Sequence, residues 1–299
     1  MLKAARILTF AILVSVVWAG MPAAAEETVT LETVTVTAQK RVEDVQDIPA
    51  SITTLTATQI EDAAITDTAD LIPVLPNVHM QHNYSENVIV IRGLSSFNTS
   101  IYSPAGVYVD DVAYPLHYMH NPEFFDIERI EVLRGPQGTL YGRNSESGVL
   151  NIVTREPGDQ FGGDVLGEYA SYNTYRLGVK VNGPLVDDVL SFGLAAQQKS
   201  SDGYIENLHN GDDKAADLDH KNARFNLRWK PSERLTLRLI ADVMETDDHV
   251  AGYRYIDGPY KTDAYEVQHD ADQTSEQNAN SQALRVQYEA DAFTVLSVT

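Results

Sequence analysis

The sequence has 299 residues, with 43 acidic and 22 basic side chains, a formal charge of −21 and no cysteine. The acidic balance argues against nucleic-acid binding, which depends on Lys and Arg contacts to phosphates. The lack of cysteine excludes disulfides and thiolate metal sites, so stability must come from hydrogen bonding and burial. The chain is long enough for two domains.

The N-terminus has the order of a secretory signal. Lys3 and Arg6 precede an apolar run over residues 7–18, and small residues follow at 23–25. This order predicts an exported chain that is cleaved before Glu26. The run is shorter than the ~20 residues of a spanning helix, and no other run comes near that length, which excludes a helical membrane protein. Loss of the signal leaves 20 basic and 43 acidic residues, a charge of −23.

The first part of the exported chain predicts a compact unit of mixed α and β structure. Thr56 with Gln59, and Thr58 with Glu61, have capping-box spacing ahead of a helix expected over residues 58–64. A second helix and four short strands are expected further along, over residues 67–74, 88–92, 106–109, 127–133 and 149–154.

The stretch between the last two of these strands is rich in glycine. It holds Gly135, Gly138 and Gly142 and shows no helix pattern. A P-loop would need Gly-Lys-Ser/Thr at the start of a helix, whereas Arg143 and Asn144 follow here. No G-x-G-x-x-G occurs either. The stretch therefore does not predict a nucleotide site.

From residue 161 onward the pattern changes to long alternating segments. Apolar side chains occupy one face and charged or amide side chains the other in residues 175–182, 222–230 and 284–290. Short links alternate with long acidic ones, the short ones being 182–188, 230–234 and 290–293 and the long ones 200–222 and 245–282. After an export signal, short turns on one side and long loops on the other predict an outer-membrane β-barrel.

A water-soluble sandwich also alternates, and it is the main alternative for any single strand. It would not need Arg176, Lys180, Arg224 and Arg228 all to face inward. In a barrel, the same alternation directs the apolar face to lipid and the charged face to the lumen.

The expected number of strands indicates whether residues 161–299 can form a complete barrel. Residues 161–299 supply about seven strands at barrel length, an odd number, and the chain stops within a strand-like run. An eight-stranded barrel is filled by its own side chains, whereas barrels of about 22 strands have plugged lumens. We therefore expect the N-terminal part of a longer protein, with about 22 strands in the complete barrel.

Several segments carry a family resemblance. Residues 125–154, FDIERIEVLRGPQGTLYGRNSESGVLNIVT, closely resemble the plug signature of TonB-dependent outer-membrane receptors. Further similarity lies in residues 47–78, VIVIRGL (88–94), AGVYVDDVAY (105–114) and ETVTVTAQKR (32–41). Residues 142–154 are most similar to the pesticin/yersiniabactin-receptor group of ferric-siderophore receptors. Asp111 departs from the family, which usually has Gly there, so we expect a more open turn.

The resemblance implies an α+β plug domain followed by the first strands of an antiparallel transmembrane β-barrel. The expected boundaries are a signal peptide over 1–25, a TonB box and linker over 26–46, a plug over 47–158 and an incomplete barrel over 159–299. It implies the outer membrane of a Gram-negative bacterium, with outer-membrane lipid against the barrel. It also implies capture of a ferric siderophore and its import, energised by the inner-membrane proton gradient through TonB and its complex.

The expected TonB box consists of Glu32, Thr33, Val34, Thr35, Val36, Thr37 and Ala38. Its alternating Thr and Val suit a strand that adds to the sheet edge of another protein. A disordered N-terminal tail is the plainer interpretation of such a segment taken alone.

Glycines and arginines of the plug have implied structural roles. The expected turn glycines are Gly93, Gly135, Gly138, Gly142 and Gly148, because glycine allows positive φ and close backbone approach to a barrel wall. By family analogy, Arg92 and Arg134 point at barrel carboxylates and lock the plug in place. Plain turn glycines with surface arginines are the alternative.

By the same analogy, the outward plug loops 79–86, 95–104 and 114–121 meet the ligand. Their candidate contact residues are His79, Gln81, His82, Tyr84, Tyr102, His117, Tyr118 and His120. Aromatic and amide groups suit a bulky chelate, although a solvated loop residue is the better interpretation of any one of them taken alone. The two H-x-x-H pairs suggest metal binding. No Asp or Glu completes either pair at a metalloenzyme spacing, so neither a metal site nor a cofactor is expected.

Other functions are weighed against this one. The sequence shows no catalytic triad and no paired general acid and base, so an enzyme is not expected. A TonB-dependent importer of haem, cobalamin or a glycan is the first alternative. A surface binding or adhesion barrel that transports nothing is the second, and the expected box at 32–38 argues against it.

Overall fold

The computed structural model describes residues 35–37, 40, 43–44, 48, 50–83, 86–96, 102–120, 122–271 and 273–299. All of them belong to the compact unit Thr35–Thr299. The predicted signal peptide and five predicted site residues lie outside the described residues: Glu32, Thr33, Val34, Ala38 and Tyr84. For His82 and Tyr118 only the backbone is described.

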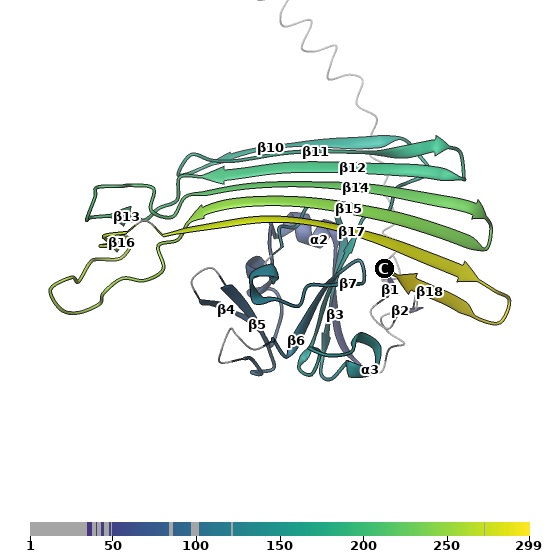
Figure 1. Cartoon of the computed structure of the whole chain (residues 1–299), viewed down its shortest axis with the longest axis horizontal. Helices are drawn as coiled ribbons and strands as arrows, with labels where there is room; N and C mark the ends of the chain where they lie inside the picture. The colour runs from purple at the N-terminus through teal and green to yellow at the C-terminus, as the bar shows by residue number, and fades with distance from the viewer. Residues whose placement is uncertain are drawn as a thin grey trace, which may run out of the picture. The chain divides into compact units, whose positions relative to one another are not determined.

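The plug is built on a five-stranded sheet (Figure 1). Its order is β3 (Ser51–Thr56), β8 (Ile127–Arg134), β9 (Gly148–Thr154), β6 (Ala105–Val109) and β7 (Val112–Ala113). Strands β6 and β9 run parallel, and the other neighbours are antiparallel. Every residue of β6 is buried. Continuous burial replaces alternation because both faces of the sheet are covered.

Apolar side chains from several elements form the plug core. Ile130, Leu133 and Ile152 on the central strands are at most 1% exposed. The hairpin of β4 (Val78–Asn83) and β5 (Glu86–Ile91) adds further buried side chains to this cluster, among them Ile89 and Ile91. Leu133 lies in a second, smaller cluster with Tyr108, Tyr141 and Val149, so the expected strands of the plug enclose two hydrophobic clusters.

One predicted capping box is confirmed at the start of α2 (Ala57–Asp62). Gln59 N donates to Thr56 Oγ1 at 3.4 Å, and Thr56 N donates to Gln59 Oε1 at 3.0 Å. The second spacing, Thr58 with Glu61, is wrong as a cap because Thr58 lies inside the helix. The cap therefore sets the helix start one residue before the predicted position.

Two further helical segments differ from expectation. The helix expected over 67–74 is reduced to the 3-10 turn η2 (Ala69–Leu71), where Ala69 N donates to Asp67 Oδ1 at 2.8 Å. The glycine-rich stretch, expected to lack helix, contains the single turn α3 (Gly138–Tyr141). Four residues are too few to show a helical period in the sequence.

A two-residue turn joins β6 to β7. Its central residues, Asp110 and Asp111, have φ of 47° and 71°, and Val109 pairs directly with Val112 across it. The more open turn expected at Asp111 is therefore wrong. Two successive positive φ values define a tight turn, and Asp is among the residues that accept them.

The remainder of the chain forms a seven-stranded antiparallel sheet, which confirms the expected number of strands. In chain order these are β10 (Gly162–Ala170), β11 (Thr174–Val186), β12 (Leu190–Ser201), β14 (Leu218–Ser232), β15 (Leu235–His249), β17 (Thr274–Glu289) and β18 (Thr294–Val298). We call this sheet the wall. Strands β10 and β18 form its two edges.

The strands of the wall are longer, and its long loops shorter, than predicted. The loops span 202–217 and 250–273, because polar residues predicted as loop continue the ladder, as in the pair Asp247 and Glu276. Ladder hydrogen bonds join backbone groups and do not require apolar side chains. Strands β13 (Glu206–Asn207) and β16 (Glu266–Val267) join the two loops in parallel.

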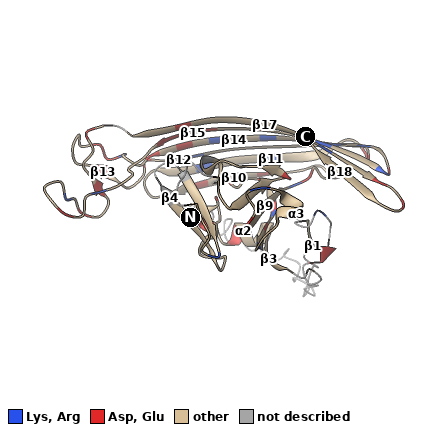
Figure 2. Cartoon of the chain, turned by 60° about the horizontal axis from the view of Figure 1, so that its bottom comes forward, with Lys and Arg blue, Asp and Glu red and all other residues tan. Residues whose placement is uncertain are grey.

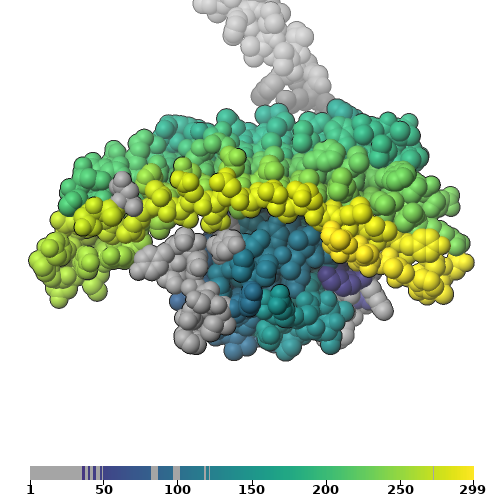
Figure 3. Space-filling view, in the orientation of Figure 1, coloured from purple at the N-terminus to yellow at the C-terminus, as the bar shows by residue number. Residues whose placement is uncertain are grey.

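The predicted alternation in the wall is confirmed. On β14, Phe225 and Trp229 are 38% and 48% exposed, whereas Arg224 and Asn226 are buried. The buried face lies against the plug, since Arg224 Nη1 donates to Phe125 O at 3.3 Å (Figure 3). No helix in the described part of the chain is long and apolar enough to cross a membrane.

Candidate functional site

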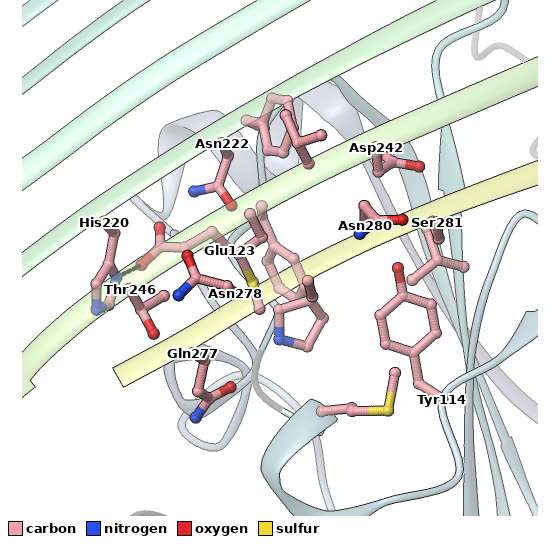
Figure 4. Close-up of a pocket in the computed structure, with 18 of the residues that line it drawn as sticks. Tyr114, Glu123, His220, Asn222, Asp242, Thr246, Gln277, Asn278, Asn280 and Ser281 are labelled. Atoms are coloured by element: carbon pink, nitrogen blue, oxygen red, sulfur yellow. Dashed lines mark hydrogen bonds and ion pairs between the residues drawn. The ribbon is translucent and has the colours of Figure 1, made fainter. Parts of the chain in front are cut away.

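A cavity of about 810 Å³ lies between the plug and strands β14, β15 and β17. Plug residues from the β6–β7 hairpin, together with Met119 and residues 122–125, form one side (Figure 4). The wall side is rich in amide, hydroxyl and charged groups: His220, Asn222, Asp242, Thr246, Gln277, Asn278, Asn280 and Ser281. This volume and mixture of groups are typical of a site for a small polar ligand.

Tyr114 follows β7 and projects toward the wall (Figure 4). Burial, and then the charge of Asp242, raise the pKa of its phenol. The phenol is therefore protonated at neutral pH and is a donor at the cavity surface. Neutral amides and this phenol can bind oxygen acceptors of a ligand without a strong preference for its charge.

Glu123 connects the plug to the wall at the edge of the cavity. His220 Nδ1 lies 2.8 Å and Lys199 Nζ lies 3.5 Å from its Oε1, and His220 Nε2 lies 2.8 Å from Asp248 Oδ1. Burial alone raises the pKa of Glu123, but the His220 hydrogen bond and the Lys199 charge outweigh it, so the pKa is lowered. The charged carboxylate ties this outward plug segment to the wall.

Of the predicted ligand residues, His117 begins η3 (His117–Met119) and His120 follows its end, and both are buried, at 4% and 0% exposure. Their ring centroids are 5.4 Å apart. Burial, and second the neighbouring His117, lower the pKa of His120 to about 4, so this imidazole is neutral at pH 7. Met119, between them, lines the cavity. No cluster of three ligating side chains occurs among the described residues.

Three further predicted contact residues, His79, Gln81 and Tyr102, do not line this cavity. His79 and Gln81 are exposed on β4, and Tyr102 is 50% exposed, with the Arg143 guanidinium 5.4 Å from its ring. Sequence reasoning missed the wall residues of the cavity and also Tyr114. The alternating polar face was a signal for the wall residues. No local signal links Glu123 to His220, which lie 97 positions apart.

The predicted lock residues have different environments. Arg134 is 7% exposed and donates from Nε to Pro76 O at 3.0 Å and from Nη1 to Thr53 Oγ1 at 2.8 Å. Its buried Nη2 has no hydrogen-bond partner within the described ranges. Arg92 is exposed, has φ of 55° and lies over Gly135. Neither guanidinium forms an ion pair with a described carboxylate.

Plug–wall ion pairs in the structure have the opposite polarity, with the cation on the wall, and the most buried of them involves Arg238. Arg238 of β15 is 2% exposed and donates from Nη2 to Thr154 Oγ1 at 2.8 Å, and this nitrogen lies 3.5 Å from Asp110 Oδ2. Thr154 Oγ1 also donates to Asp110 Oδ2 at 2.5 Å. Removal of one partner would leave a buried charge uncompensated, which is strongly destabilising.

The described residues of the predicted TonB box are docked on the plug. Val36 is 0% exposed, and β1 (Thr35–Val36) pairs antiparallel with β2 (Glu43–Asp44). Thr37 N donates to Glu131 Oε1 at 2.9 Å, and Arg129 Nη2 donates to Thr37 Oγ1 at 2.8 Å. Glu131 is itself fully buried. These residues are therefore held by specific contacts.

The predicted turn glycines fall into two groups. Gly93, Gly135, Gly142 and Gly148 have φ between 74° and 154°. Gly138 has no positive φ, and a Cβ built on it meets nothing within 4 Å. A Cβ on Gly148 would lie 2.3 Å from Leu133 O, so this position requires the absence of a side chain.

Comparison with known proteins identifies the plug. The TonB-dependent Receptor Plug Domain family matches residues 44–149. The fold of the rest agrees: the crystal structure of the ferric yersiniabactin uptake receptor FyuA from Yersinia pestis superposes with a TM-score of 0.73 at 27% identity. The chain belongs to the TonB-dependent receptors.

Relatives of this receptor agree with that assignment. Pesticin receptors of Yersinia enterocolitica and Yersinia pestis are 32% identical over 187 residues, covering 62% of this chain and 28% of theirs. The iron-regulated outer membrane virulence protein of Vibrio cholerae is 29% identical over 239 residues, covering 76% of this chain and 36% of its own. The FyuA alignment covers 81% of this chain and 39% of that chain.

This chain therefore spans less than two fifths of the length of each of these relatives. The relatives are outer-membrane receptors, and this TonB-dependent receptor is an outer-membrane protein of a Gram-negative bacterium, as predicted. The predicted fold class, a plug followed by antiparallel barrel strands, is also confirmed.

Proposed function

We propose that the receptor containing this chain captures a ferric siderophore at the cell surface and imports it into the periplasm. The energy would come from the inner-membrane proton gradient through TonB and its complex. The observation that carries the proposal is that the same plug sheet borders the cavity and binds the box segment. A polar cavity adjoins β6 and β7, and the box segment is docked on β8.

The cavity supports a chelate as the ligand. Its wall supplies side-chain amides at Asn222, Gln277, Asn278 and Asn280, and its plug side supplies the neutral Tyr114 phenol. Such groups bind the carbonyl, hydroxyl and ring oxygens of a chelate that already surrounds its iron. In this proposal the iron is cargo and needs no protein ligand. The similarity to receptors named for pesticin and ferric yersiniabactin favours the siderophore class.

The docked segment supports energy coupling. Residues 32–38 are proposed as the TonB box, which would leave the plug and add as a strand to TonB. Figures 1 and 2 show β1 at the opposite end of the molecule from the loop that carries β13. A pull on this segment would therefore act on the plug at a distance from the long loops.

The test is Val36→Pro in the whole receptor. Proline removes a backbone N–H and cannot join a ladder at this position, so uptake should be abolished. Binding of labelled ferric chelate at the surface of whole cells should be unchanged, because the cavity residues are intact. Binding and accumulation are measured in the same cells. Normal accumulation by this variant would contradict the proposed box.

Val36→Ala is the matched control. It keeps the backbone donor and should retain most of the uptake, which separates strand pairing from side-chain packing. Accumulation of haem, cobalamin or a glycan in place of a ferric siderophore would change the ligand in this proposal and leave the role of the box intact.

A further inference from the structure

The tip of the β6–β7 hairpin carries two adjacent carboxylates at the junction of three parts of the molecule. Asp110 is 5% exposed, and the Asp111 side chain is 14% exposed. Asp110 lies 3.5 Å from Arg238, and Asp111 lies 3.8 Å from Arg285, both on the wall. Figure 2 shows charged positions along the wall strands in blue and red. The tip is thus bound to β15 and β17.

Asp111 has a second cationic partner, from the segment that follows the box. Lys40 Nζ forms an ion pair and hydrogen bond with Asp111 Oδ1. The same ammonium lies 4.2 Å from the ring centroid of Tyr141, which adds a cation–π contact. Lys40 is three residues from Thr37, whose backbone is hydrogen-bonded to Glu131. The box segment therefore has two anchors on the plug, one to β8 and one to the hairpin tip.

The element behind the tip is the most weakly paired strand of the plug sheet. Strand β7 has two residues, pairs only with β6 and forms the sheet edge. Val112 and Ala113 of this strand, together with the following Tyr114, line the cavity. A displacement of the tip therefore alters one side of the cavity, whereas the central strands β8 and β9 are paired on both sides.

We propose that Asp111 is a positioning residue that couples the box segment to β7. At rest it also holds the β6–β7 hairpin against the wall. In the resting receptor, Lys40 and Arg285 share its carboxylate and keep the box segment docked. A pull on the box would draw Lys40 away and, through the ion pair with Asp111, exert force on the hairpin tip. This force would displace β7 and open the cavity. This inference rests on the proposed TonB-coupled function and assigns the route by which the pull reaches the cavity.

Accessibility of a single thiol tests the resting clamp. Residues 1–299 contain no cysteine, so Val36→Cys introduces a single thiol among them, at a fully buried position that a maleimide reaches only when the segment undocks; labelling of the receptor with native Val36 is subtracted. In whole receptor in outer membranes, Asp111→Gly and Lys40→Gln should each speed labelling about fivefold, the effect of losing one partly exposed ion pair. Asp111→Gly suits the φ of 71°, so the turn itself should be preserved.

Two further variants complete this experiment. The double variant Asp111→Gly, Lys40→Gln should label no faster than Lys40→Gln alone, because that single variant already removes both the ion pair and the cation–π contact. Asp291→Asn removes a carboxylate paired with Arg234 at 2.7 Å on another short turn, and its labelling should equal that of the parent. Unchanged labelling in both the Asp111 and the Lys40 variants would overturn the clamp. This readout needs no transport, so it does not depend on the proposed function.

The route of the pull is tested by comparing TonB binding with uptake. In the Asp111→Gly receptor with native Val36, TonB should copurify at least as well as with wild type, because the box is less restrained. Accumulation of ferric chelate should fall about fivefold, since the pull no longer reaches β7 through Lys40. Normal accumulation would overturn the route. Absence of accumulation in the wild type would instead count against the proposed function.

Discussion

The core of the plug and the buried face of wall strand β14 differ in the kind of side chain that they bury. Every residue of plug strand β6 is buried, and most side chains of the main plug core are Ile, Val and Leu. On wall strand β14, Phe225 and Trp229 are exposed and Arg224 and Asn226 are buried. The plug thus follows the rule of a water-soluble domain. The wall follows the rule of a barrel, in which apolar groups face lipid and polar groups face the interior.

The difference shows where each region obtains its stability. The plug has a hydrophobic core of its own, whereas the buried face of the wall depends on polar contacts with the plug. Arg238 and Glu123 show this dependence, since each is buried and each has its partners across the interface. Three substitutions or conditions test this contrast, in order of decreasing expected effect.

The largest effect is expected at Gly148 in the plug. Gly148→Ala places a Cβ 2.3 Å from Leu133 O and 3.0 Å from Ile91 Cδ1, at a φ of 154°. Backbone strain and overpacking together should lower the free energy of unfolding of the plug by about 4 kcal/mol. Thermal unfolding of the purified receptor measures it. Gly138→Ala is the control and should be neutral, since its Cβ meets nothing. Equal stability of the two variants would refute the close contact at Gly148.

An intermediate effect is expected on the outer face of the wall. Phe225 lies at the centre of the 15-residue strand β14 and is 38% exposed. Phe225→Arg should cost about 3 kcal/mol, because a charge at mid-bilayer depth is poorly solvated by lipid. Urea titration of receptor folded into lipid vesicles gives this value. Tyr204→Arg, on the loop 202–217, is the control and should cost little. A neutral Phe225→Arg would mean that this face does not contact lipid.

A smaller effect is expected from pH, through His120 in the plug. Its pKa is about 4 in the folded plug and about 6.5 in an unfolded chain. Between these values the unfolded chain binds more protons, so stability is lost as pH falls below about 6.5. The loss should reach about 2 kcal/mol at pH 5 relative to pH 7.

The matched variant for this pH effect is His120→Gln. Burial raises the pKa of other plug carboxyls, such as Asp67 and Asp126, and their contribution has the opposite sign. Comparison of wild type with His120→Gln at pH 7 and pH 5 removes this shared background. An identical pH dependence in both proteins would show that His120 is not kept neutral by burial.

Local patterns in the sequence predicted much of the fold. The alternation of side chains predicted the seven wall strands, and the Thr56–Gln59 spacing predicted the start of α2. Both signals arise within one element, because side-chain direction in a strand and capping in a helix depend on neighbouring residues. The resemblance of residues 125–154 predicted the family, which the comparisons with relatives bear out.

The predictions failed where distant partners decide the structure. Strand ends rich in Asp, Asn and Gln were expected as loops, yet they pair because a neighbouring backbone lies beside them. The plug–wall pair seen in the structure places the arginine on the wall, at Arg238, and its carboxylate on the plug, at Asp110. Neither outcome can be read from residues close in sequence.

The sequence by itself determined that two regions of different pattern follow one another and in which direction each wall side chain points, since these depend on composition and on periods of two to four residues. Only the tertiary structure decided which charges meet. Glu123 and His220 are 97 positions apart, and Lys40 and Asp111 are 71 apart. An ion pair depends on distances of a few ångströms, which exist only after the chain has brought the plug, the wall and the box segment together.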